Sequence, residues 1–171
     1  MALKRQSGFT IIELVITITI VAILAAIALP KYVALQADAR VAKLQAALGS
    51  VKAAAALAKA ICLTQTATGS TTSLMAGGCN VAAGATIGVI MDGTNVLTGF
   101  SYPTAAAGGI QVAAQLLATD YAVSFLVANQ MLVSPIGASV PASCSFTYVW
   151  APVANGSPTI TLNAAATAAN C

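Results

Sequence analysis

The feature that most constrains this chain is a stretch of 21 residues, Phe9 to Leu29, in which Glu13 is the only charged residue. As an α-helix with a rise of about 1.5 Å per residue it is about 30 Å long, which matches the hydrocarbon core of a bilayer. Lys4 and Arg5 precede it, so its start should lie on the cytoplasmic side of a membrane. We therefore expect one membrane-inserted helix, with the rest of the chain outside.

The composition agrees with an exposed apolar surface. Hydrophobic residues make up 58% of the 171 residues and charged residues only 6%, against about 25% charged in a typical globular domain. Histidine is absent, and the only acids are Glu13, Asp38, Asp92 and Asp120. General acid-base catalysis and metal ligation therefore lack suitable residues, so we expect no enzyme, no metal and no cofactor. The net charge of the residues after Arg5 is close to zero, which does not indicate a nucleic-acid-binding surface.

Glu13 separates three interpretations of the apolar stretch. A secretory signal peptide cleaved after Ala26-Ile27-Ala28 would have an unusually long apolar region and would have to tolerate the acid. A plain single-pass anchor leaves the acid unexplained. An acid inside a membrane helix is costly, so the third interpretation is that Glu13 meets a positive group supplied by another chain.

The start of the stretch, Gly8-Phe9-Thr10-Ile11-Ile12-Glu13-Leu14 after a short basic leader, resembles the processing and assembly motif of type IV prepilins. The resemblance implies that prepilin peptidase removes residues 1–8 by cutting between Gly8 and Phe9, and that it N-methylates Phe9. It also implies that Phe9 and Glu13 mediate subunit assembly into a homo-oligomeric helical filament. Within one chain the Phe9 amine and Glu13 lie about one helical turn apart, so pairing within a subunit and a favourable helix-dipole position remain alternatives.

The same resemblance implies an α+β pilin fold, in which a long N-terminal helix over residues 9–62 is followed by a globular β head over residues 63–171. Residues 9–29 form the protruding membrane or filament-core half, and residues 30–62 form an amphipathic half, with Pro30 as a possible kink. Apolar residues spaced by three and four should pack that half on the head: Val41, Leu44, Leu48, Val51, Ala55, Ala58 and Cys62. A second set recurs every seven residues and is either solvated or in contact with neighbouring chains: Lys31, Asp38, Gln45, Lys52 and Lys59. Pro30-Lys31-Tyr32-Val33, with Leu35-Gln36 and Asp38-Ala39-Arg40, further resembles mannose-sensitive haemagglutinin-type major pilins.

In the head, residues 64–73 are polar and of low complexity, which predicts an exposed loop. Apolar runs on both sides of Asp92-Gly93 predict a hairpin over residues 87–100. We expect a short helix around residues 109–118, and strands at residues 121–127, 144–150 and 159–162 in an antiparallel sheet.

Four cysteines in a chain that lies mostly outside the cytoplasm favour disulfides, and four cysteines allow three connectivities. Proximity in sequence favours Cys62 with Cys79 and Cys144 with Cys171. The second pair also resembles the disulfide-bounded C-terminal loop of type IV pilins.

These observations predict a structural subunit, the major pilin, of a type IV pilus for adhesion, motility or surface attachment. The chain would be stored in the inner membrane as a single-pass prepilin, and the pilus assembly machinery would then polymerise it into an extracellular filament. The alternatives are a pseudopilin of a type II secretion system and a secreted monomeric binding domain released at Ala28.

Overall fold

A computed structural model describes residues 8–68, 88–127, 129–153 and 156–171. They divide into two compact units between Gln36 and Ala37, and each is described by itself. The elements in chain order are α1 (Ile11–Thr68), β1 (Gly88–Met91), β2 (Thr94–Gly99), β3 (Tyr102–Pro103), α2 (Ile110–Ala113), β4 (Tyr121–Val127), β5 (Gln130–Pro135), β6 (Phe146–Val149) and β7 (Thr159–Leu162).

Helix α1 is 58 residues long and contains Pro30 without ending there. The sequence predicted a helix to Cys62 followed by a polar loop, and this was wrong for residues 64–68, which are helical. The hydroxyls of Thr64, Thr66 and Thr68 each donate to a backbone carbonyl four residues earlier, at 2.7 to 3.0 Å. These bonds satisfy the polar groups within the helix, so the threonine-rich composition does not require a loop. Residues 69–73 of the predicted loop lie outside the described part.

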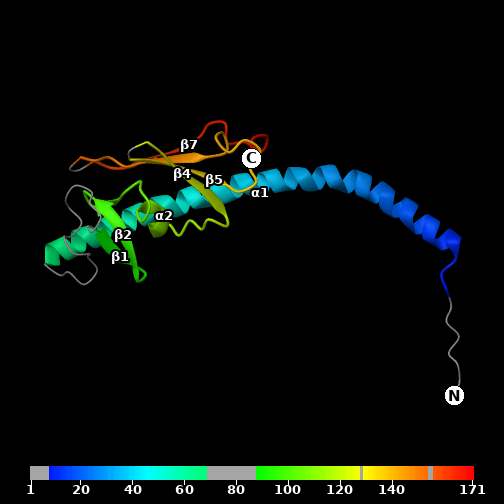
Figure 1. Cartoon of the computed structure of the whole chain (residues 1–171), viewed down its shortest axis with the longest axis horizontal. Helices are drawn as coiled ribbons and strands as arrows, with labels where there is room; N and C mark the ends of the chain where they lie inside the picture. The colour runs from blue at the N-terminus through cyan, green and yellow to red at the C-terminus, as the bar shows by residue number, and fades with distance from the viewer. Residues whose placement is uncertain (1–7, 69–87, 128, 154–155) are drawn as a thin grey trace, which may run out of the picture. The chain divides into compact units, whose positions relative to one another are not determined.

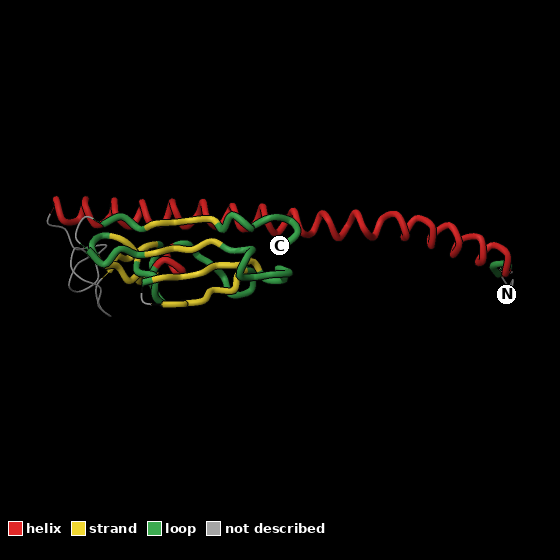
Figure 2. The backbone as a smooth tube through the Cα atoms, turned by 90° about the horizontal axis from the view of Figure 1, so that it is seen from above, coloured by secondary structure: helices red, strands yellow, loops and turns green. Residues whose placement is uncertain are grey.

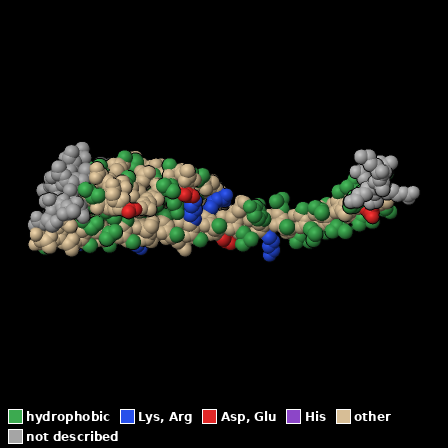
Figure 3. Space-filling view, turned by 90° about the horizontal axis from the view of Figure 1, so that it is seen from below, with side chains coloured by type: hydrophobic (Ala, Val, Ile, Leu, Met, Phe, Trp, Pro, Cys, Tyr) green, Lys and Arg blue, Asp and Glu red, His purple; other side chains and the backbone are tan. Residues whose placement is uncertain are grey.

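In the N-terminal unit, every described residue from Gly8 to Gln36 is exposed. Hydrophobic side chains cover this part of α1 on the face drawn in Figure 3. A helix that is apolar on all sides needs lipid or other helices around it.

The head unit, Ala37–Cys171, contains two antiparallel sheets. The first has the order β1-β2-β3, and its β1–β2 hairpin pairs Met91 with Thr94 across the predicted Asp92-Gly93 turn. Both turn residues have positive φ, 48° and 71°, as a type I′ hairpin turn requires. The second sheet has the order β4-β5-β6-β7.

The C-terminal part of α1 runs alongside strands of the head (Figures 1 and 2). The predicted stripe is confirmed. Leu44, Val51 and Ala55 are buried in one core cluster, and Val41 and Leu48 are partly buried against it. Ala58 and Cys62 are buried in a second cluster, which they share with residues of β1 and β2. Inward-facing residues of β5 and β6 pack on the helix, namely Met131, Val133, Phe146 and Tyr148. The long helix and antiparallel sheets form the α+β pilin fold that was predicted.

Several head elements differ from the sequence prediction in detail. The strands at residues 121–127 and 159–162 are present as predicted, and β6 occupies the middle of the predicted strand at residues 144–150. The predicted helix at residues 109–118 is reduced to α2, because Gln115 takes a positive φ of 52° that ends the helical turn. Strand β5, which lies between β4 and β6, was not predicted.

Candidate functional site

The first turn of α1 contains a capping interaction between Thr10 and Glu13. Glu13 Oε2 accepts from the backbone N–H of Thr10 at 2.9 Å and from its hydroxyl at 2.8 Å. In return, the Glu13 N–H donates to Thr10 Oγ1 at 3.3 Å. This is the reciprocal capping box of a Thr-x-x-Glu sequence, and it satisfies backbone donors that a helix N-terminus otherwise leaves open. Glu13 therefore has a local role in starting the helix.

The capping box engages only one of the two carboxylate oxygens. Among the described residues, no hydrogen bond reaches Glu13 Oε1, and no basic side chain pairs with the carboxylate. Glu13 is exposed in the isolated chain. The carboxylate therefore keeps an open acceptor and its negative charge at the start of the helix.

The predicted cleavage point lies before this helix. Gly8, Phe9 and Thr10 are outside α1, and Phe9 is 86% exposed. A β-carbon added at Gly8 would meet no atom within 4 Å. The bond between Gly8 and Phe9 is thus in non-helical, accessible backbone, as a peptidase substrate must be.

Helix α1 contains a segment near its N-terminus that is long and apolar enough to cross a membrane, and none of that segment is buried. Its exposed apolar side chains include Ile11, Ile12, Leu14, Val15, Ile16, Ile18, Ile20, Val21, Ile23, Leu24, Ile27 and Leu29. Complete burial of one such side chain is worth about 1.5 to 3 kcal/mol, so a dozen of them strongly favour lipid or other helices over water.

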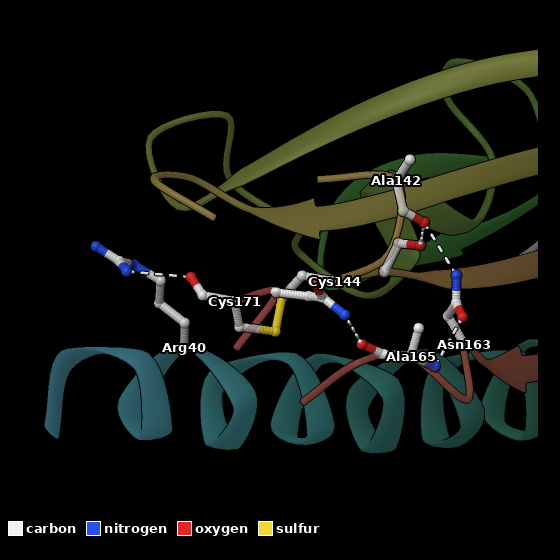
Figure 4. The surroundings of a disulfide bond; sticks show 8 residues. Arg40, Ala142, Cys144, Asn163, Ala165 and Cys171 are labelled. Carbon is white, nitrogen blue, oxygen red and sulfur yellow. Dashed lines mark hydrogen bonds between the residues drawn. A yellow bond between two sulfur atoms is a disulfide. The ribbon is translucent and has the colours of Figure 1, made fainter. Parts of the chain in front are cut away.

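At the far end of the chain, Cys144 and Cys171 form a disulfide with a Cα–Cα distance of 5.1 Å, and both residues are fully buried. Figure 4 shows Arg40 of α1 beside this bond, where its Nη1 donates to the Cys171 carbonyl at 3.1 Å. Asn163 Nδ2 donates to the Ala142 carbonyl at 3.0 Å and links the two segments that the disulfide joins. The disulfide therefore ties the C-terminal residue to the segment before β6, and Arg40 links that residue to α1.

The other predicted cysteine pair is described only in part. Cys62 is buried and disulfide-bonded. Cys79, its expected partner, lies outside the described residues. No group of three or more His, Cys, Asp or Glu residues within the described ranges could hold a metal ion.

A second link between α1 and the head is built on Lys43. Its Nζ lies 2.5 Å from Asp120 Oδ1 and 5.2 Å from the centre of the Tyr121 ring. The Tyr121 hydroxyl donates to the Lys43 carbonyl at 3.2 Å. Burial raises the pKa of Tyr121, a shift that Lys43 opposes and Asp120 adds to. Both charged side chains are about two-fifths exposed, so solvent screens this pair and it adds little stability.

Sequence reasoning placed Glu13 in the site but missed its capping partner. The signal was present, because Thr10 and Glu13 have the Ser/Thr-x-x-Asp/Glu spacing in front of an apolar run. The Arg40 and Lys43 contacts were also missed, since each joins the helix to residues more than seventy positions away.

In a comparison with known protein families, the prokaryotic N-terminal methylation motif matches residues 3–29. The comparison with curated proteins finds no match. The comparison with solved structures finds none either. The match covers residues 3–8 of the leader, the Gly8-Phe9 junction, Glu13 and the apolar stretch, so it indicates processing by prepilin peptidase and assembly into a pilus-like system. Residues 3–29 accordingly carry the mark of a class III, type IV pilin-like leader, and this motif supports a type IV pilin-like or pseudopilin role for the chain.

Proposed function

We propose that this chain is the major structural subunit of an extracellular type IV pilus used for surface attachment. The observation that carries the proposal is the exposed apolar helix from Ile11 to Leu29, which has no covering protein within the described chain. In the precursor, lipid would cover this helix. In the filament, the same helices of many copies would cover one another.

The removal of residues 1–8 would leave a methylated ammonium on Phe9 next to the start of α1. We propose that this amine pairs with Glu13 of a neighbouring subunit. An unpaired charge within a bundle of apolar helices is costly, so this pair would fix the stagger between subunits. The open Oε1 of Glu13 supports the proposal, because the capping box leaves that oxygen available.

The test must separate the charge of Glu13 from its capping role, because the structure gives this residue both. Glu13→Gln keeps an amide oxygen that can accept from Thr10 but removes the charge. Thr10→Val removes the capping hydroxyl but keeps the charge of Glu13. Each variant, together with Glu13→Ala, replaces the wild-type chain in cells, and surface filaments are counted by electron microscopy while membrane fractions are blotted for the chain.

We expect all three variants to insert into the membrane. We expect Glu13→Gln and Glu13→Ala to form few filaments, and Thr10→Val to form filaments close to the wild-type number. Normal filaments from Glu13→Gln would show that capping, and not charge, is the contribution of this residue.

Two further measurements test the subunit assignment itself. Mass spectrometry of the mature chain should find a methylated Phe9 at its N-terminus, whereas a secreted domain released at Ala28 would begin at Leu29. In cells lacking the gene, the proposal predicts the loss of long surface fibres with protein export intact. Loss of export with surface fibres intact would instead identify a pseudopilin.

A further inference from the structure

Two lysines of α1 in the head unit lie over tyrosine rings, and only one of them has an acid beside it. Lys43 Nζ lies 5.2 Å from the centre of the Tyr121 ring, and Asp120 completes that cluster. Lys59 Nζ lies 5.0 Å from the centre of the Tyr102 ring and donates to the Tyr102 hydroxyl at 2.9 Å. No acid of the described residues pairs with Lys59. Its charge is held in place but is not neutralised.

The cluster around Lys59 contains hydroxyl groups in place of an acid. The Tyr102 hydroxyl lies 3.3 Å from Ser157 Oγ, within hydrogen-bond distance. The pKa of Tyr102 is lowered, chiefly by the hydrogen bond from Lys59 and next by the one with Ser157. The second cluster thus presents a fixed cation and two hydroxyls, and it lacks a counterion from the described chain.

This cluster forms one wall of an open groove of about 350 Å³ on the head. The groove is lined by polar groups of Lys52, Lys59, Tyr102 and Ser157, and by an apolar floor made of Ala55, Ala56, Ala60, Leu63, Pro158 and Ile160. None of the lining residues is acidic. The groove therefore combines positive charge, hydroxyl partners and an apolar surface with one aromatic ring.

The spacing of its charges indicates an extended ligand. Lys52 and Lys59 are seven residues apart on one helix, which places their backbones about 10 Å apart along the helix axis. Lys52 is exposed and forms no ion pair with the described residues. No Lys or Arg follows Lys59 in the sequence, so these two ammonium groups are the last basic groups of the chain. A single aspartate of another protein would satisfy only one of them, whereas a polymer with a charge on each repeating unit would satisfy both.

We propose that this groove binds an acidic polysaccharide, with its sugar carboxylates on Lys52 and Lys59. The Tyr102 and Ser157 hydroxyls exchange hydrogen bonds with sugar hydroxyls. The apolar floor and the Tyr102 ring cover the C–H face of a sugar ring. This binding function is additional to filament formation and does not depend on it.

The test uses the full mature chain in a non-ionic detergent without sugar groups, and fluorescent polygalacturonate as the probe, with neutral dextran as the comparison polymer. The wild-type chain should bind polygalacturonate and not dextran, and binding should weaken as salt screens the charges. Lys52→Gln with Lys59→Gln should weaken binding about tenfold or more. Lys31→Gln is the matched control for the single variant Lys52→Gln, because each removes one exposed helix charge, and the change at Lys31, outside the groove, should leave binding unchanged.

Two further variants guard against a folding defect. Lys52→Gln alone should weaken binding without disturbing the head, because Lys52 forms no ion pair or side-chain hydrogen bond in the described structure. Lys52→Arg with Lys59→Arg should retain binding. Failure of the wild-type chain to bind polygalacturonate, or equal binding by the double Gln variant and the control, would overturn the proposal. Absence of polygalacturonate binding together with loss of filaments in the double Gln variant would also overturn it, and would identify the groove as a subunit contact.

Discussion

Tyr148 provides the most direct test of how the two sheets of the head are joined. It lies on β6 of the four-stranded sheet, is fully buried, and donates its hydroxyl to the carbonyl of Pro103 on β3 at 2.6 Å. Tyr148→Phe deletes this hydrogen bond and keeps the ring. The bond itself is worth about 0.5 to 1.5 kcal/mol, and a buried carbonyl left without its donor costs about 1 to 3 kcal/mol. We therefore expect the substitution to lower the free energy of unfolding by about 1 to 3 kcal/mol at neutral pH.

The same residue gives the head a dependence on alkaline pH. Burial, with a smaller contribution from Tyr102, raises the pKa of Tyr148 well above its ordinary value of 10.0. The unfolded chain then loses the Tyr148 proton near pH 10 while the folded chain keeps it. The stability contributed by this group is therefore complete below about pH 10 and falls as the pH rises further, by about 1.4 kcal/mol per pH unit. The Tyr148→Phe variant has no such hydroxyl, so its free energy of unfolding should fall less above pH 10 than that of the wild-type chain.

Trp150 provides the readout, because it is the only tryptophan and is 4% exposed in the head core. Its fluorescence during urea unfolding of the full chain in detergent gives the free energy of unfolding at each pH. Tyr32→Phe, an exposed tyrosine of the N-terminal unit, is the matched control and should behave as the wild-type chain does. A Tyr148→Phe variant as stable as the wild-type chain at pH 7, or one with an equal loss above pH 10, would refute the reasoning.

Three other predictions concern the contacts that hold the head together. Replacing Cys144 and Cys171 by Ala should lower the free energy of unfolding by about 3.5 kcal/mol in the chain-entropy model, since the bond closes a loop with a sequence separation of 27. A decrease below about 1 kcal/mol in urea unfolding would show that other contacts already hold the C-terminal segment. Leu44→Ala in the fully buried core should lower the free energy of unfolding by about 2 to 5 kcal/mol, whereas Leu57→Ala, at a 54% exposed position of the same helix, should lower it far less. Equal melting temperatures for the two variants would contradict this packing. Asp120→Asn, which breaks a half-exposed ion pair, should change the unfolding free energy by no more than about 1 kcal/mol, and a larger loss would mean that the pair is better shielded from water than its exposure indicates.

The sequence predicted those elements of the fold that depend on local patterns. Three-and-four spacing located the buried face of α1, and the Asp92-Gly93 turn between apolar runs located the first hairpin. Strand β5 could also have been predicted from the sequence, because Asn129, a residue type common at turns, precedes the apolar run Met131-Leu132-Val133. Asn129 takes a positive φ of 69°, as residues at tight turns often do.

Other features could not be predicted from local patterns because they join distant residues. Arg40 meets Cys171 across 131 positions and Lys43 meets Asp120 across 77, and neither contact leaves a periodic signal in the sequence. The groove on the head likewise depends on the fold, which brings Ser157 to Tyr102 and Lys59. Sequence spacing placed Lys52 and Lys59 on one face of the helix but could not show that Lys59 would donate to the Tyr102 hydroxyl.

The geometry at the start of α1 allows Glu13 to cap the helix and also to make the proposed contact with a neighbouring subunit. A capping box needs a side-chain oxygen of Glu or Gln at the third helical position, and an intersubunit ion pair needs a negative charge at the same end of the helix. Thr10 engages Oε2 of Glu13, while no described residue bonds to Oε1. The hydrogen bond from the Thr10 backbone N–H, which Thr10→Val would keep, fixes the carboxylate at the start of α1 and reduces the side-chain entropy that the proposed ion pair would have to overcome. Aspartate at this position would be one methylene shorter and could not both reach back to Thr10 and extend toward a neighbouring amine. We therefore expect Glu13→Asp to assemble less well than the wild-type chain although its charge is retained, and filament counts equal to wild type would contradict this combined role.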